Sequence, residues 1–285
     1  MKTLADFQKT KEFLVCVDSD GCAMDTMDIK HFRCFGPCMV VEWGLEQWKQ
    51  PILDRWNEVN LYTMTRGINR FKGLSHALLE VNEKYMSIDG VKELADWVET
   101  SPELSNEALQ RQIELVPDCQ IFKKALAWSI EVNKNIKALP EEEIKPYEGV
   151  REALAFAHER ADVAIVSSAN LGAVLEEWEK HELLPHTDIV LAQNAGSKAF
   201  CIAELLKKGY SLDKVLMCGD APGDMQAAEK NGVFYYPILV RNEAQSWSEF
   251  MAEGLERMIN GTYAGEYQRK KRNEFLNNLG GNDNA

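Results

Sequence analysis

Short runs of apolar residues alternate with amphipathic segments over much of the chain. The runs are continuously hydrophobic, as strands buried on both faces of a parallel sheet are. We expect strands at 13–17, 163–166, 188–191, 214–218 and 233–236. The segments next to the last four runs have a helical period, and we expect helices at 150–160, 171–183, 198–208 and 223–230. This alternation predicts an α/β fold with a doubly wound, Rossmann-like parallel sheet.

The first expected strand is separated from the second by a long segment that carries helix signals. Its first part, 42–62, has bulky apolar residues at near-helical spacing, which favours packing over a ligand groove: Trp43, Trp48, Leu53 and Trp56. A further helix is expected at 69–85. We therefore predict an α-helical domain at 31–145, inserted into a core made of residues 1–30 and 146–240.

Capping residues suggest where several further helices begin. Ser101-Pro102 is a favourable start, because proline suits the first helical position, and Asp118 can cap the helix that follows it. Ser246-Trp247-Ser248-Glu249 has the pattern of a capping box. We expect a C-terminal helical extension at 241–285, whose last residues, Gly280-Gly281-Asn282-Asp283, fray.

Composition and charge exclude several classes of protein. The chain has 285 residues, 45% of them hydrophobic, and a net charge of −13. Its length suits one large domain or two unequal ones. The acidic balance disfavours nucleic-acid binding, and no apolar stretch approaches the length of a membrane span. The start of the chain lacks a leader pattern and the seven cysteines are scattered, so we expect a cytoplasmic protein.

Polar side chains follow four of the expected strands at the point where each strand ends. Because the carboxyl ends of parallel strands meet at one edge of a sheet, we expect these side chains to lie close together. The residues concerned are Asp18 and Asp20, Ser167 and Ser168, Lys198, and Asp220 and Asp224.

Carboxylates gathered at a buried edge repel one another unless a hard cation lies among them. We therefore predict a Mg²⁺ site. Asp18, Asp20 and Asp220 are the expected ligands, and Asp224 is a further contact.

An acidic metal site with one lysine and one hydroxyl suits phosphoryl transfer. Asp18 would attack phosphorus and form an aspartyl-phosphate. Asp20 would protonate the leaving oxygen and later activate water. Ser167 would donate a hydrogen bond to a phosphoryl oxygen, and Lys198 would neutralise the charge shared by Asp18 and the phosphoryl group.

The order of these motifs resembles the haloacid dehalogenase (HAD) superfamily, phosphatase branch. The family's first motif, DxDGxxxD, reads here as 18–25, and the next two are a hydroxyl residue closing a strand, Ser167, and Lys198. The fourth, GDxxxD, is Asp220 with Asp224. The resemblance implies that the inserted helical region is a cap, which closes over the site in many members.

One departure from the family pattern and one match to it affect the assignment. Lys198 is followed by Ala199 where the family usually has proline, which leaves Lys207 and Lys208 as poorer alternatives. Asp20 argues against a dehalogenase, since members of that branch resemble this first motif but lack the second carboxylate.

Substrate specificity is expected to come from the cap. Arg66 and Arg70 are four residues apart, so on a helix they would share a face and could meet an anionic substrate; the alternative is that they pair with cap glutamates. Ser168 and Asn170 are further candidates for substrate binding, and His31 is either functional near the hinge or structural.

These observations favour a Mg²⁺-dependent phosphatase that hydrolyses a small phosphomonoester, because a large cap excludes macromolecules. A phosphomutase of the same superfamily and a catalytically idle binding or scaffold protein remain as alternatives. A receiver domain is disfavoured, since its acceptor aspartate lies on a middle strand of the sequence, whereas Asp18 follows the first.

Overall fold

The computed structural model describes residues 3–281 and divides into two compact units. One comprises the chain up to Met27 together with the chain from Glu141, and we call it the α/β unit. The other, Asp28–Pro140, we call the helical unit. The division falls close to the boundaries expected from the sequence at residues 31 and 145.

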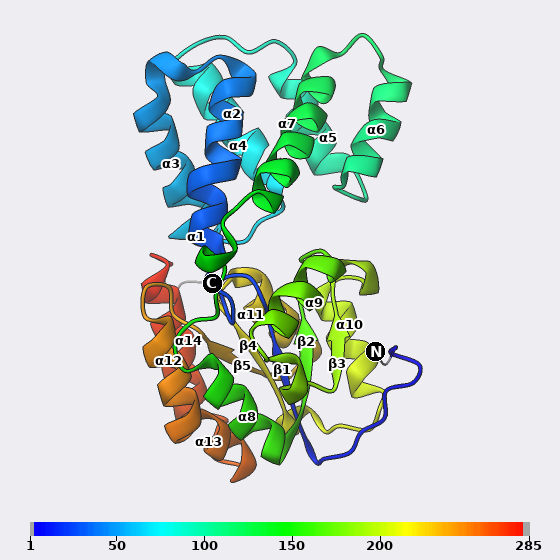
Figure 1. The fold of residues 1–285 in the computed structure, drawn as a ribbon, viewed down its shortest axis with the longest axis vertical. Helices are drawn as coiled ribbons and strands as arrows, with labels where there is room; N and C mark the ends of the chain where they lie inside the picture. The colour runs from blue at the N-terminus through cyan, green and yellow to red at the C-terminus, as the bar shows by residue number, and fades with distance from the viewer. Residues whose placement is uncertain (1–2, 282–285) are drawn as a thin grey trace. The chain divides into compact units, whose positions relative to one another are not determined.

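The α/β unit is built on a five-stranded parallel sheet with the order β3-β2-β1-β4-β5 (Figure 1). The expected doubly wound α/β fold is therefore confirmed, and each expected strand is present. The strands are β1 Phe13–Val17, β2 Ala161–Val166, β3 Ile189–Leu191, β4 Val215–Gly219 and β5 Phe234–Pro237.

Strand β1 lies at the centre of the sheet, although it comes first in the chain. Its last residue, Val17, pairs with Ile165 of β2 on one side and Cys218 of β4 on the other. The residues that follow these three strands therefore leave the sheet at the same edge.

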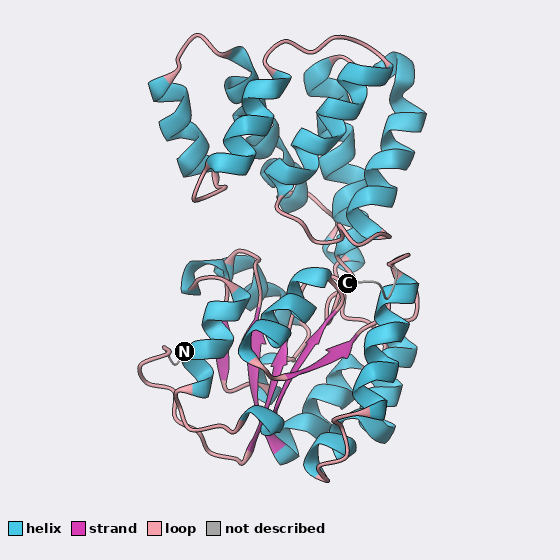
Figure 2. Ribbon diagram, turned by 180° about the vertical axis from the view of Figure 1, so that it is seen from behind, coloured by secondary structure: helices cyan, strands magenta, loops and turns pink. Residues whose placement is uncertain are grey.

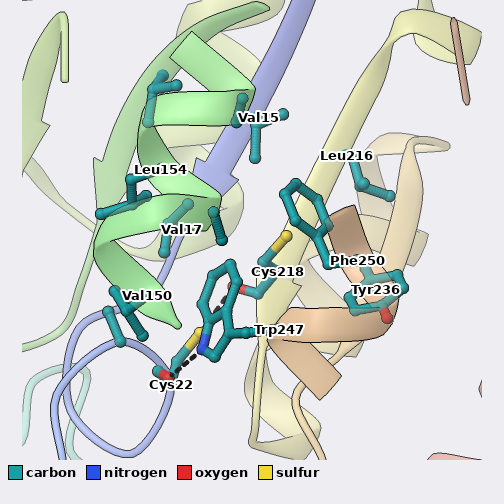
Figure 3. Packing of buried hydrophobic residues seen from close by; sticks show 14 of the residues in the cluster. Val15, Val17, Cys22, Val150, Leu154, Leu216, Cys218, Tyr236, Trp247 and Phe250 are labelled. Carbon is teal, nitrogen blue, oxygen red and sulfur yellow. Dashed lines mark hydrogen bonds between the residues drawn. The ribbon is translucent and has the colours of Figure 1, made fainter. Parts of the chain in front are cut away.

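Helices cover both faces of the sheet (Figure 1). On one face Val15 and Val17 belong to a buried cluster with residues of α8, α9, α12 and α13, and part of this cluster is shown in Figure 3. Helix α11 packs against β4 and β5 and against α10. The helices of this unit are α8 Val150–Arg160, α9 Leu171–Lys180, α10 Lys198–Leu206, α11 Pro222–Asn231, α12 Glu243–Glu249, α13 Leu255–Ile259 and α14 Glu266–Asn278.

The described part of the C-terminal extension belongs to the α/β unit. Helix α14 packs along β5, and the Tyr263 hydroxyl donates to the Tyr235 carbonyl at 2.7 Å. The capping box expected at Ser246 was wrong, because α12 has already begun at Glu243. The Ser246 hydroxyl instead donates to the Asn242 carbonyl at 2.9 Å inside the helix. Of the residues expected to fray, 282 and 283 lie outside the described part.

The helical unit consists of helices, turns and loops (Figure 2). A π-helical turn at His31–Phe35 joins α1 and α2 into one helical run. In the described residues no helix is long and apolar enough to cross a membrane. The helices are α1 Met27–Lys30, α2 Gly36–Trp43, α3 Lys49–Leu61, α4 Arg70–Lys84, α5 Val91–Thr100, α6 Asn106–Leu115 and α7 Gln120–Lys137.

Several helix ends in this unit differ from those expected. The segment 42–62 is broken, because Gly44 adopts a left-handed conformation with φ of 66° and ends α2. Ser101-Pro102 does not begin a helix: α5 ends at Thr100, and the side chain that caps α6 is that of Ser105. Asp118 does not cap α7, which begins at Gln120 without a side-chain cap.

Aromatic side chains fill the interior of the helical unit. Trp128 is fully buried, contacts the rings of Phe35 and Trp56, and donates its indole N–H to the Phe35 carbonyl at 3.1 Å. The Trp56 indole donates to His31 Nδ1 at 3.0 Å. Trp56 and Trp128 therefore hold the helices together, and one nitrogen of His31 is engaged in the same packing.

Candidate active site

Asp18 is the first residue after β1 and is buried at the edge of the sheet. Its backbone N–H donates to the Cys218 carbonyl of β4 at 3.0 Å, which fixes the start of the loop. One carboxylate oxygen, Oδ1, accepts the Ser19 backbone N–H at 2.8 Å, and the other, Oδ2, lies 2.7 Å from Lys198 Nζ. Both oxygens of Asp18 are thus held by donors from different parts of the fold.

Lys198 stands between two carboxylates. It begins α10, whose N-cap is Ser197, and its Nζ donates to Asp224 Oδ1 at 2.5 Å while it pairs with Asp18. The lysine therefore joins the end of β1 to the start of α11 through side chains alone.

The two alternative lysines lie elsewhere. Lys207 pairs with Glu204 on the surface, and Lys208 donates to the Ala5 carbonyl. Only Lys198, among these three, contacts a carboxylate that follows a strand.

Burial and charge act against each other at this cluster. Burial raises the pKa of Asp18 to about 6, although the Lys198 ammonium opposes this rise. Burial also raises the pKa of Asp224 against the same opposing lysine. Burial alone would lower the pKa of Lys198, but the two carboxylates outweigh it and raise that pKa. The lysine is therefore held as a cation, and its charge favours ionised carboxylates beside it.

The loop between β4 and α11 depends on a glycine. Asp224 Oδ2 accepts the Ala221 backbone N–H at 3.0 Å, and the carboxylate thereby lies against Gly219. A Cβ at Gly219 would come within 2.3 Å of Asp224 Cγ. Since side chains cannot approach so closely, only glycine allows Asp224 to occupy this position.

Three carboxylates are close enough to bind one cation. Asp18, Asp220 and Asp224 each offer an oxygen within 4.8 Å of the others, and all three residues are buried. Oxygen donors of this kind are the ligands that Mg²⁺ and Ca²⁺ prefer, so the donor set fits a hard divalent cation.

Asp20 has different surroundings from these three carboxylates. Its Oδ1 accepts the hydroxyl of Thr26 at 2.7 Å. The next residue, Gly21, has φ of 81°, which lets the chain turn sharply after Asp20. The carboxylate cluster that the described residues form does not include Asp20.

The predicted polar residues after β2 differ in exposure. Ser167 is buried, and its Oγ accepts the Ala169 backbone N–H at 3.1 Å, so its own hydrogen remains to be donated. Ser168 is exposed. Asn170 caps α9, with its Oδ1 accepting from the backbone N–H of Gly172 at 3.0 Å.

The two arginines of the helical unit do not share a helix face. Arg66 lies in the turn before α4, is 2% exposed, and donates to the Leu61 carbonyl at 2.8 Å. Arg70 begins α4 and donates to Ser129 Oγ at 3.1 Å and Asn133 Oδ1 at 2.7 Å. Burial lowers the pKa of Arg70. The sequence interpretation of a common face was wrong, because α4 starts after Arg66.

Several residues that support the site were not found from the sequence. Thr26 bonds Asp20, and the Tyr235 hydroxyl donates to the Gly219 carbonyl, next to Asp220, at 2.9 Å. Thr26 follows the first motif directly, so a polar residue there was a usable signal. The place of Tyr235 in an apolar strand gave no such signal.

Comparisons with known proteins agree with this fold. A family model described as haloacid dehalogenase-like hydrolase matches residues 68–237. A haloacid dehalogenase-like family hydrolase from Xanthomonas campestris is similar in structure at 14% identity, with a TM-score of 0.53, over 90% of this chain and 97% of that one. No curated protein matches.

Two further solved structures are more distant in shape. One is a haloacid dehalogenase-like hydrolase from Streptococcus pneumoniae at 14% identity, over 82% of this chain and 90% of that one, with a TM-score of 0.49. The other is a putative beta-phosphoglucomutase from Thermotoga maritima at 17% identity, over 79% and 84%, with a TM-score of 0.45. The family model spans more than half of the chain, and the chain therefore belongs to the haloacid dehalogenase-like hydrolases.

Proposed function

We propose that this hydrolase is a Mg²⁺-dependent phosphatase that cleaves a small phosphomonoester through an aspartyl-phosphate on Asp18. The observation that carries the proposal is Lys198, which bridges Asp18 and Asp224 beside Asp220. A nucleophilic carboxylate, a cation fixed against it and a cluster of oxygen donors are the groups that phosphoryl transfer uses.

Asp18, Asp220 and Asp224 would hold the metal ion, with Asp20 as the remaining expected contact. When bound, Mg²⁺ supplies positive charge to the phosphoryl oxygens and lowers the repulsion between them and the carboxylates. Asp224 has a second task in this arrangement, because it fixes the position of Lys198.

The chain's own residues carry the covalent steps. An oxygen of Asp18 forms a bond to phosphorus while the ester P–O bond breaks, and Asp20 gives its proton to the leaving oxygen. Asp20 then takes a proton from water, whose oxygen attacks phosphorus and breaks the bond to Asp18. Inorganic phosphate leaves, and both carboxyl groups return to their starting states. Ser167 and Lys198 donate to the phosphoryl oxygens in both steps.

The helical unit is proposed to act as the cap that selects the substrate, with Arg70 as its expected contact and Ser168 and Asn170 as those of the α/β unit. Arg66 was the other expected contact, but it is 2% exposed and donates to the Leu61 carbonyl, which favours a structural role inside the helical unit. We also propose a cytoplasmic enzyme with a small phosphorylated substrate. The seven described cysteines are free thiols, which supports a reducing compartment.

Phosphate release from a panel of small phosphomonoesters tests the proposal. The wild type should release phosphate with Mg²⁺ and stop when a chelator is added, and Asp18→Asn should be inactive while keeping the wild-type circular dichroism spectrum. Turnover only in the presence of an added sugar bisphosphate would instead indicate a mutase. Release of phosphate by Asp18→Asn at the wild-type rate would contradict the mechanism.

A further inference from the structure

Two buried tryptophans donate their indole N–H groups to the loop that carries Asp18 and Asp20. We call residues 18–24 the nucleophile loop. Trp178 of α9 donates to the hydroxyl oxygen of Ser19 at 2.9 Å. Trp247 of α12 donates to the carbonyl oxygen of Cys22 at 3.0 Å (Figure 3). Both indoles are fully buried, and both acceptors lie within two residues of Asp20.

The nucleophile loop is closed by its own backbone. The Ser19 carbonyl accepts the N–H groups of Ala23 at 3.0 Å and Met24 at 2.8 Å, and the Gly21 N–H donates to the Met24 carbonyl at 2.8 Å. These bonds set the shape of the loop. Its position in the fold depends on the groups that hold it from outside, and the two indoles are such groups.

Trp247 is itself fixed in place by its neighbours. Its ring meets that of Phe250 edge-on at 5.6 Å, and the Tyr236 hydroxyl of β5 donates to the carbonyl of the adjacent Ser246 at 2.9 Å. Helix α12 therefore presents a rigid ring with a single donor to the Cys22 carbonyl. Because the donor is fixed, the Cys22 carbonyl cannot move away or rotate without losing its hydrogen bond.

We propose that Trp247, together with Trp178, is a positioning residue that holds Asp20 where it can protonate the leaving oxygen. This inference rests on the proposed phosphatase function. It also assigns a role to the C-terminal extension, since Trp247 reaches the nucleophile loop from 225 residues further along the chain. Neither tryptophan follows a strand, so neither belongs to the sequence motifs that predicted the site.

Replacing Trp247 by phenylalanine removes the donor and keeps an aromatic ring. The matched control is Trp128→Phe, which also removes a buried indole N–H that donates to a backbone carbonyl, but inside the helical unit. If Trp247→Phe fails to fold, Trp178→Phe repeats the test by removing the indole donor to Ser19.

The first measurement is the dependence of kcat on the leaving group. An alkyl phosphate needs Asp20 as its acid, whereas para-nitrophenyl phosphate has a leaving group that departs without a proton. We expect Trp247→Phe to lower kcat about tenfold or more for the alkyl ester and by less than about threefold for the aryl ester. Trp128→Phe should change both esters by the same factor.

The second measurement does not depend on activity. Amide hydrogen exchange at Cys22, Ala23 and Met24 should become faster in Trp247→Phe and stay at the wild-type rate in Trp128→Phe. If the wild type hydrolyses neither ester, the phosphatase proposal fails and the exchange rates alone decide whether the indole holds the loop.

Two results would overturn the inference. Unchanged exchange in the nucleophile loop would show that the indole does not hold it, whatever the kinetics. Faster exchange in Trp247→Phe, together with an equal fall in kcat for both esters, would show that the indole holds the loop but does not position Asp20.

Discussion

Lys198 and Asp18 form an ion pair of 2.7 Å at the carboxyl edge of the sheet, although one begins a helix and the other directly follows a strand. The same ammonium group contacts Asp224 at 2.5 Å. One cation thus neutralises part of the charge of two buried carboxylates. Lys198 thus links Asp18 to Asp224 of α11, and removal of its ammonium group should affect the positions of both carboxylates.

Lys198→Gln should lower kcat/KM about a hundredfold or more, because a fixed donor to the phosphoryl oxygens is lost. The control is Lys207→Gln, which breaks a surface pair with Glu204 and should leave the rate unchanged. Steady-state kinetics with the best ester of the panel provide the measurement. Equal activity of the two variants would contradict the assignment of Lys198.

Gly219→Ala should displace the Asp224 side chain, because the new Cβ would lie 2.3 Å from its Cγ. Overpacking of this kind costs about 1–3 kcal/mol in the free energy of unfolding, and we expect activity to fall with it. Gly223→Ala, four residues later, is the control, since its Cβ would meet no atom within 4 Å. Urea denaturation should show Gly219→Ala to be less stable than the wild type and Gly223→Ala to be at least as stable.

Asp220→Asn should weaken Mg²⁺ binding, because it removes one anionic ligand from the cluster of three carboxylates. Saturating Mg²⁺ should raise the thermal midpoint of the wild type, by an amount that corresponds to about 2.7 kcal/mol at a hundred times Kd. The variant should show a smaller shift. Asp213→Asn alters an exposed aspartate before the first residue of β4, at the opposite end of that strand from Asp220, and should behave as the wild type does. An equal shift in Asp220→Asn would exclude Asp220 as a ligand.

Asp162 gives a prediction for acid stability away from the site. Burial alone would raise its pKa, but hydrogen bonds from Thr10, Tyr210 and the Lys11 backbone outweigh burial and lower the pKa below its ordinary value of 3.8. The stabilisation is therefore present above about pH 4 and is lost as pH falls through the lower pKa of the folded state.

Asp162→Asn should accordingly be less stable than the wild type at pH 7, by about 2 kcal/mol or more, and the difference should narrow as the pH falls towards 3. Chemical denaturation at a series of pH values measures this change. Asp213→Asn alters an exposed carboxylate, and its free energy of unfolding should change with pH as that of the wild type does. A constant difference between Asp162→Asn and the wild type across the series would contradict the prediction.

The sheet could be predicted from the sequence because its strands are continuous apolar runs. Strand β1 has the expected bounds, and the others differ by one or two residues at their ends. Asp18, Ser167 and Asp220 could be predicted as site residues for the same reason, since each follows such a run directly. Their proximity then follows from the parallel order of the strands.

Helix ends were harder to predict, because a polar side chain near a helix can form hydrogen bonds with several local backbone groups. Ser101 was expected to begin a helix, but its hydroxyl donates to the Glu103 carbonyl after α5 has ended. Ser105, four residues later, caps α6. Either serine has the chemistry of a cap, and only the packing of the helical unit selects between them.

The contacts that hold the nucleophile loop could not be predicted either. In the sequence, Trp178 and Trp247 look like ordinary core residues, and the structure places both in the buried core. Their hydrogen bonds to Ser19 and Cys22 span 159 and 225 residues of sequence. Periodicity detects that a tryptophan is buried but carries no information on where its N–H points.

The central position of β1 determines the order in which the site can form during synthesis. The ribosome releases β1 and the whole helical unit before β2 begins at Ala161, and β4 follows only from Val215. Synthesis proceeds at about 5–20 residues per second, so several seconds pass between the synthesis of β1 and that of β2, the first strand with which it can pair. The nascent chain therefore carries the unpaired apolar segment of β1 through the whole synthesis of the helical unit, and in this interval that segment is available for a chaperone to bind.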